Sequence, residues 1–120
     1  MKIFKTLFTQ PCFVTSLLIS ILCSPVAFAQ PEVCQGGDGA GLTIIEDCSN
    51  NPTPECILKA CNSITDPSKC NQSAVMTYRS KEDHLWNIHG AFSCIFVKID
   101  IDSPAACYPQ RGVACVIKRQ

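Results

Sequence analysis

Hydrophobic and polar residues alternate most regularly in the stretch from Ala91 to Asp102. Its odd-numbered positions carry mainly alanine, isoleucine and valine, whereas its even-numbered positions change from phenylalanine and cysteine to lysine and aspartate. A period of two residues is typical of a β-strand with one buried face. The pattern therefore predicts a strand over residues 91–102, ended by Ser103-Pro104.

Three shorter apolar segments predict further strands, at residues 42–45, 75–79 and 113–118. Asp66-Pro67-Ser68-Lys69 predicts a turn ahead of the second of these segments. The third segment is expected to pair with the long strand, and Cys115 could tie it to the sheet. Together the segments predict a small antiparallel sheet.

Two helix-start signals lie between the strands. Thr53-Pro54 combines an N-cap residue with proline at the first helical position, which predicts a helix over residues 54–62. Ser80-Lys81-Glu82-Asp83 resembles a capping box and predicts a second short helix that runs through His89 and stops at Gly90. The expected fold class is α+β: a small disulfide-rich single domain with a short antiparallel sheet and one or two short helices.

The first 29 residues have the features of a secretory signal peptide. Lys2 and Lys5 give a basic start, residues 13–23 are apolar, and Ala27-Phe28-Ala29 places small residues before the expected cleavage site. The apolar run is too short for a membrane span, and no stop-transfer charges follow it. We therefore expect an extracellular protein whose mature chain, residues 30–120, is one cysteine-rich domain without a membrane span.

Eight cysteines remain after the predicted cleavage. An even number in a short exported chain predicts four disulfides, which compensate for a small apolar core. Spacing cannot choose among the roughly 100 connectivities that eight cysteines allow. Export also gives meaning to Asn71-Gln72-Ser73, which is an N-glycosylation sequon if the host is eukaryotic. The eight are Cys34, Cys48, Cys56, Cys61, Cys70, Cys94, Cys107 and Cys115.

The charge of the mature chain narrows the choice of partner. Two of the 10 Lys and Arg residues lie in the leader, so eight face 10 Asp and Glu residues and the net charge is about −2. No block of one sign is present. Nucleic acids and anionic membranes attract proteins through a basic patch or stripe, so neither partner is expected.

Zinc binding is the main alternative use of the cysteines. Four residues separate Cys56 from Cys61, and four separate His84 from His89. This spacing suits paired zinc ligands. The thiols would have to be reduced, whereas the secretory route oxidises them. Disulfides without a cofactor are therefore the first expectation, and zinc is the alternative. The alternative ligand sets are Cys56, Cys61, His84 and His89, or Cys70, His84, His89 and Cys94.

Candidate binding residues are few, and no catalytic set is recognisable. Trp86 lies between charged residues of the predicted second helix, where it could be a half-exposed binding anchor or part of the core. Residues 108–112 join Cys107 to Cys115 and could form a tethered loop that presents Tyr108 and Arg111, or a simple connection. No nucleophile elbow and no nucleophile–base pair is found, so an enzyme is not expected.

The combination of features resembles the small, secreted, cysteine-rich effector or avirulence proteins of plant-pathogenic fungi such as the rusts. Shared are the export signal, the short mature chain, the even number of cysteines and the lack of a catalytic motif. The resemblance is to a class and carries over no site residue. It implies a secreted binding protein that acts on a host protein, outside cells or after delivery into one. The alternatives are a zinc-binding effector domain and an extracellular protease inhibitor or toxin.

Overall fold

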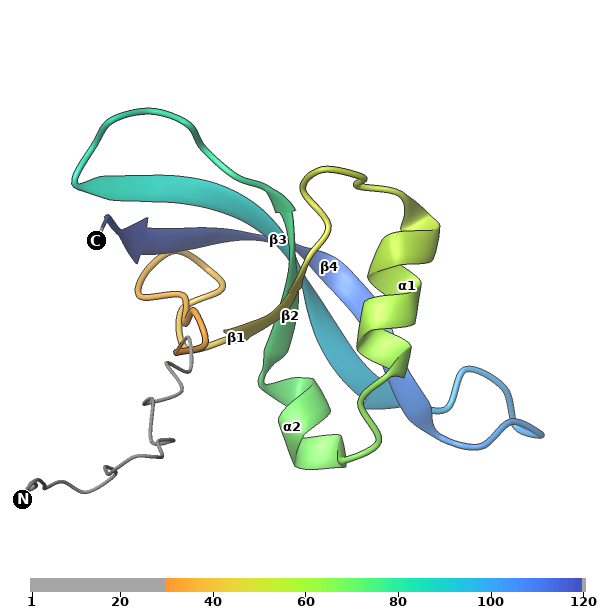
Figure 1. Cartoon of the computed structure of the whole chain (residues 1–120). Coiled ribbons are helices and arrows are strands. Elements are labelled where there is room, and N and C mark those ends of the chain that lie inside the picture. Colours follow the sequence, from red (N-terminus) through yellow and green to blue (C-terminus); the bar gives the residue numbers. More distant parts are fainter. Residues whose placement is uncertain (1–29, 120) are drawn as a thin grey trace, which may run out of the picture. The chain divides into compact units, whose positions relative to one another are not determined.

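Four strands and two helices make up the part of the chain that the computed structural model describes, residues 30–119 (Figure 1). In chain order they are β1 (Thr43–Asp47), α1 (Pro54–Asn62), α2 (Pro67–Asn71), β2 (Ser73–Tyr78), β3 (Trp86–Val97) and β4 (Ala106–Lys118). These elements, together with four disulfides, confirm the prediction of a small disulfide-rich α+β fold. The predicted signal peptide, residues 1–29, lies outside the described residues.

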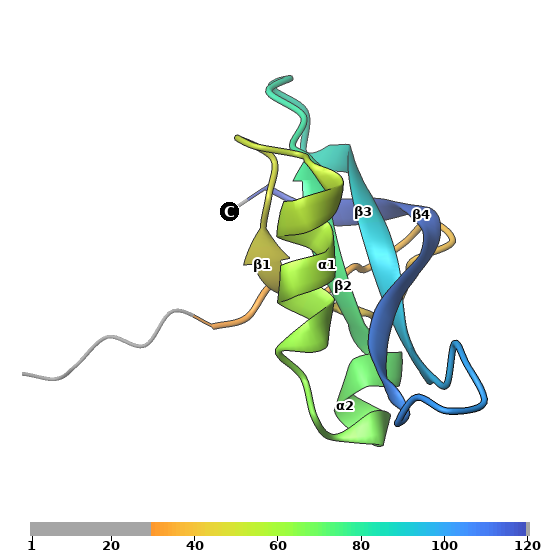
Figure 2. The ribbon, with the colours of Figure 1, turned by 90° about the vertical axis from the view of Figure 1, so that its right-hand side faces the viewer.

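The sheet is mixed, not purely antiparallel as the sequence predicted. Its strand order is β1-β2-β3-β4, with β1 parallel to β2 and the other neighbours antiparallel. Parallel neighbours need a crossover connection. Both helices lie in the connection between β1 and β2, and Figure 2 shows them on the same side of the sheet.

The first helix forms as its start signal predicts. The Thr53 hydroxyl accepts a hydrogen bond from the Cys56 amide at 3.2 Å, and Pro54 occupies the first turn, where its missing amide proton is not needed. The predicted turn at residues 66–69 extends into α2. There the Asp66 carboxylate caps the helix by accepting from the amide of Ser68 at 2.9 Å.

The predicted helix up to His89 is wrong. Residues 79–85 form an irregular connection, and β3 begins at Trp86. The local capping signal is overridden because this segment pairs along its length with β4, so that Trp86 lies opposite Lys118. Gly90, expected to end a helix, lies inside β3, where a Cβ atom would come within 3.2 Å of the Tyr78 Cβ.

Apolar side chains pack on both faces of the sheet. On the helix side, Val75 and three disulfides pack against α1 and α2. On the opposite side, Met76 packs with Ala91, Val113 and the Cys34–Cys115 disulfide. The two clusters occupy opposite sides because neighbouring residues of a strand, such as Val75 and Met76, point to opposite faces.

The segment before β1 joins the two edge strands of the sheet. Val33 forms a bridge with Thr43 of β1, and Gly36 forms a bridge with Val116 of β4. Gly37 follows with φ of 81°, and a Cβ at this position would meet the Ala114 carbonyl oxygen at 2.4 Å. Only glycine fits such a close approach in this backbone conformation. The segment therefore covers the C-terminal half of β4's outer edge, which would otherwise offer unpaired backbone groups.

Candidate functional site

All eight described cysteines form disulfides, as expected from their even number. The pairs are Cys34–Cys115, Cys48–Cys56, Cys61–Cys94 and Cys70–Cys107. Two of the bridges attach the far half of the β3–β4 hairpin to the helices: Cys61 lies in α1 and Cys70 in α2. These two bridges hold the connection between β3 and β4 at a fixed position relative to the helices.

The structure does not bring the proposed zinc ligands together. Cys61 and Cys70, one from each ligand set, are bonded to Cys94 and Cys107, so their thiolates are unavailable in the oxidised protein. Within residues 30–119, no three His, Cys, Asp or Glu side chains are grouped so that they could hold a metal ion. Zinc binding through these sets would require reduction of the bridges and a rearrangement of the sheet.

The two histidines have separate surroundings. His84 is exposed, and its Nε2 lies 2.6 Å from Oε1 of Glu82. His89 is buried in β3, and its Nδ1 accepts a hydrogen bond from the backbone amide of Ser80 at 2.8 Å. Burial, together with the positive charge of Arg79, lowers the pKa of His89. The neutral ring therefore fixes the start of the connection 79–85.

Trp86 is half-exposed, as one of its two interpretations predicted. Its exposed fraction is 49%, and it stands at the start of β3 instead of on a helix. The Lys118 ammonium lies 5.9 Å from the centroid of the ring, within the range of a cation–π contact. One face of the indole is therefore occupied by a residue of the neighbouring strand.

Residues 108–112 are not a presenting loop. They lie inside β4, with Tyr108 opposite Ile95 and Arg111 opposite Ser93 of β3. The Arg111 guanidinium donates to the Asp38 carboxylate at 3.2 Å, which ties it to the segment before β1. The tethered loop, one of the two interpretations of these positions, does not form, because the whole stretch pairs with β3 over a long range in sequence.

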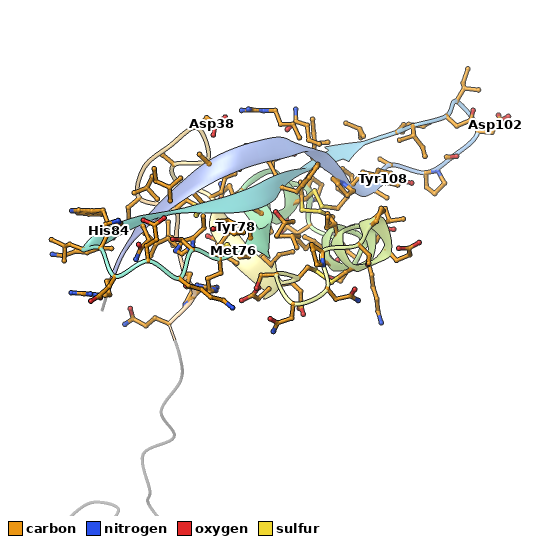
Figure 3. The ribbon with its side chains drawn as sticks, turned by 90° about the horizontal axis from the view of Figure 1, so that it is seen from above. Asp38, Met76, Tyr78, His84, Asp102 and Tyr108 are labelled. Carbon is orange, nitrogen blue, oxygen red and sulfur yellow. A yellow bond between two sulfur atoms is a disulfide. The ribbon has the colours of Figure 1, made fainter. Side chains whose placement is uncertain are left out.

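The connection that does project is residues 98–105, between β3 and β4, which we call the hairpin tip. Figure 3 shows it extending away from the body of the domain, with Asp102 near its end. Ile99 is 66% exposed and Ile101 is 86% exposed, the largest values among the exposed large apolar residues. The sequence pattern had placed both isoleucines in a strand. The neighbouring Ser103-Pro104 was the available signal for a turn.

Hydrogen bonds hold both the base and the end of the hairpin tip. At the base, the Asn71 Oδ1 accepts from the Phe96 amide at 3.0 Å, and the Asn62 side-chain amide donates to the Cys107 carbonyl. At the end, the Ser103 amide donates to the Asp100 carbonyl at 3.1 Å. Two disulfides and these hydrogen bonds restrict the conformations of the free tip. The tip therefore loses less conformational entropy when it binds a partner.

A second apolar surface lies at the opposite end of β3, which we call the open sheet face. It consists of Tyr78, Trp86, Ile88, Gly90 and Ala114, beyond the part of the sheet that the helices cover. Tyr78 is 60% exposed and Ile88 is 64% exposed. Between them Gly90 leaves a shallow hollow of about 510 Å³. Sequence patterns alone do not predict this face, because it depends on which strands become neighbours.

No protein-family model, curated protein or solved structure matches the chain. Among the described residues, no helix has the length and apolar character that crossing a bilayer requires. The chemistry of the two exposed surfaces therefore has to be inferred from their own geometry. Both are suited to contacts with other molecules, since large apolar side chains gather there in contact with solvent.

Proposed function

We propose that the chain is a secreted binding protein of the effector type, which recognises a protein of another organism through its hairpin tip. The observation that carries the proposal is the exposure of Ile99 and Ile101 on a connection braced by two disulfides. Large apolar side chains so exposed gain free energy when a partner buries them. A braced connection keeps more of that gain, since it loses little conformational entropy.

The tip also suggests what its partner looks like. Isoleucines at 99 and 101 alternate with aspartates at 100 and 102, so each apolar side chain is close to a carboxylate. A complementary partner surface is an apolar pocket with a basic rim. The backbone of the tip forms a turn from Asp100 to Ser103 and not an extended strand. This favours insertion of the tip into a pocket over its addition to a sheet as a strand. This conformation gives no support to a protease-inhibitor function.

Binding is proposed in preference to catalysis because of what the histidines contact. His89, the buried one, accepts from a backbone amide and not from a side-chain nucleophile. His84 faces Glu82 at the surface. General-base activation of a nucleophile requires the base within hydrogen-bond reach of the reacting group. The contacts of these two rings support structural roles.

The test is a saturable binding measurement with the disulfide-bonded mature protein. Soluble extracts of a candidate host are fractionated, and binding of labelled protein is titrated against each fraction. We expect one protein to bind, and the double variant Ile99→Ser, Ile101→Ser to lose at least about tenfold in affinity, since burying one isoleucine contributes about 1.5–3 kcal/mol. Leu58→Ser is the matched control, because Leu58 is 42% exposed on α1.

A second comparison tests the basic rim. Asp102→Asn removes a carboxylate from the tip, and it leaves Asp100, whose carbonyl forms the turn, unchanged. We expect weaker binding and a smaller dependence of affinity on salt. Absence of any saturable partner would contradict the proposal, as would equal binding by the double variant and the wild type.

A further inference from the structure

Residues 80–84, which we call the strap, belong to the connection between β2 and β3 and run alongside the first part of β3 (Figure 1). Two side chains of β3 fasten the strap, one at each end. The His89 Nδ1 accepts a hydrogen bond from the Ser80 amide at 2.8 Å, and the Asn87 side-chain amide donates to the His84 carbonyl at 3.2 Å. Asn87 and His89 are two residues apart in a strand, so they lie on the same face of the sheet.

The contact between the strap and the sheet is polar and therefore weak. Further along the same face, Ala91 and Met76 belong to the apolar core, whereas the strap closes over Asn87 and His89. The Asn87 Oδ1 is buried, and within residues 30–119 no group donates a hydrogen bond to it. A buried acceptor without a partner costs free energy that is recovered when water reaches it. Hydration of this oxygen therefore offsets part of the cost of opening the strap.

The hydrogen bond at Ser80 exists only while the His89 ring is neutral. A backbone amide can only donate, so Nδ1 must offer its lone pair, and the proton of the neutral ring lies on Nε2. A protonated imidazole carries a proton on both nitrogens and accepts no hydrogen bond. Uptake of a proton by His89 therefore replaces the bond to Ser80 with a contact between two donors.

Charged groups close to His89 come from three segments of the chain. Arg79, just before the strap, donates to the carboxylates of Glu32 and Asp47. The hydrogen bond from Arg79 lowers the pKa of Glu32, and hydrogen bonds to the carboxylate of Asp47 outweigh burial and lower its pKa too. Both carboxylates are thus ionised where an imidazole titrates, and the Arg79 contacts persist there. The charged residues of the strap itself, 81–83, are exposed.

The other elements around the ring add no charge that would hold a proton on it. β2 contains no acidic or basic residue, and β3 contains none besides His89. The residue opposite His89 on β4 is Cys115, which is bonded in a disulfide. Asp38 lines the same hollow as His89, but its carboxylate already accepts from the Ala114 amide and from Arg111. A proton therefore binds His89 more readily once the strap has opened and water reaches the ring.

We propose that residues 80–84 form an acid-sensitive strap, which is closed while His89 is neutral and opens when His89 binds a proton. The contacts of Arg79 limit the opening on one side, and the Arg119 amide, which donates to the Leu85 carbonyl, limits it on the other. The domain therefore keeps its fold while one polar face of β3 becomes accessible. The proposal goes beyond the binding function above and does not rest on it, since the hairpin tip lies at the opposite end of β3.

Nuclear magnetic resonance of the wild-type mature protein between pH 7.5 and pH 5 tests the proposal. At pH 7.5 the Nδ1 of His89 should carry no proton, and the ring should bind one as the pH falls. Exchange of the Ser80 amide with water, corrected for the intrinsic effect of pH on amide exchange, reports whether the strap is closed. The ratio of open to closed strap changes about tenfold per pH unit where the two forms differ by one proton. We therefore expect the protection of Ser80 to fall at least about fivefold, while that of Met76 in the core stays constant.

Two variants identify the ring that controls the strap. His89→Asn keeps an acceptor for the Ser80 amide but binds no proton, so protection of Ser80 should no longer depend on pH. His84→Asn is the matched control and should open like the wild type, because Asn87 contacts the backbone carbonyl at this position.

Three outcomes would overturn the proposal. Constant protection of Ser80 while His89 titrates would show that the proton does not open the strap. An equal loss of protection at Met76 would mean that the whole domain unfolds. A response that His84→Asn abolishes would assign control of the strap to the exposed ring.

Discussion

The guanidinium of Arg79 donates two hydrogen bonds to the carboxylate of Glu32, from Nη2 to Oε1 at 2.8 Å and from Nη1 to Oε2 at 2.9 Å. The same guanidinium donates from Nε to the Asp47 carboxylate at 3.1 Å. Arg79 follows β2, Glu32 precedes β1, and Asp47 ends β1. The cluster therefore holds the segment before β1 against the first two strands.

Replacing Glu32 with glutamine should lower the free energy of unfolding at pH 7 by about 1 kcal/mol, a small value because both side chains are partly exposed to water. The hydrogen bond from Arg79 lowers the pKa of Glu32 below its usual 4.5. This stabilisation is present above pH 4.5 and is lost as the pH falls through the pKa of the folded state. Urea unfolding should therefore separate Glu32→Gln from the wild type at pH 7 and bring them closer at pH 3.

The exposed Glu46 of β1 offers a matched control for this measurement. Glu46→Gln removes one negative charge, as Glu32→Gln does, but leaves the hydrogen bonds between Arg79 and Glu32 intact. An equal loss of stability in both variants would mean that net charge, and not the Arg79–Glu32 contact, causes the effect.

His89 makes stability depend on pH in a higher range. Its pKa is lowered in the folded protein, first by burial and then by the charge of Arg79, against the opposing charges of Glu32 and Asp47. The unfolded chain binds a proton near the ordinary value of 6.5, while the folded protein resists it. The contribution of the neutral His89 ring to the free energy of unfolding is therefore fully present above pH 6.5. It decreases as the pH falls from 6.5 towards the lowered pKa.

Unfolding curves between pH 7.5 and pH 5 test this behaviour. The slope can reach about 1.4 kcal/mol per pH unit where the two states differ by one full proton. We expect the slope to flatten in His89→Asn, whose amide oxygen can still accept from Ser80, and to persist in His84→Asn at the surface. A wild-type curve that is flat across this range would contradict the buried, neutral ring.

Local signals were reliable where the chain interacts with itself over a few residues. The helix that Thr53 caps begins and ends as predicted, because capping and the proline lie within one turn. The segment 80–89 was misread because its capping signal is equally local, while its actual partner is β4, far along the chain. The exposed isoleucines were missed for a related reason. Alternation continues through the tip, and only the pairing of Val97 with Ala106 shows where the hairpin stops.

The disulfides should contribute unequally to stability. Cys34 and Cys115 are 81 residues apart, whereas Cys48 and Cys56 are 8 apart. Restriction of the unfolded chain grows with loop length, so removing the first bridge should cost about 4.5 kcal/mol and removing the second about 2.5 kcal/mol. Guanidinium unfolding of the paired alanine variants measures both values. The reverse order would mean that strain or residual structure, and not loop length, decides the contribution.

Asn71 should carry a glycan when the protein passes through a eukaryotic secretory pathway. Its side chain is exposed at the end of α2, and its Oδ1 accepts from Phe96, which leaves Nδ2, the atom that bears an N-linked glycan, available. Ser73 completes the sequon and is buried, with its hydroxyl donating to the Lys69 carbonyl at 2.6 Å. The sequon and the local fold therefore depend on the same hydroxyl group.

Variants at Ser73 separate the modification from the fold, because Asn71 itself holds the base of the tip. Ser73→Ala should abolish the glycan, seen as a lower intact mass, and reduce stability by about 1 kcal/mol through loss of one hydrogen bond. Ser73→Thr keeps both the sequon and a hydroxyl, and should remain glycosylated. If neither the wild type nor Ser73→Thr gains mass in a eukaryotic host, while both are secreted with four disulfides, the site is not used. The tip would then be free of a neighbouring glycan, and partner binding should not change when the protein is produced in bacteria.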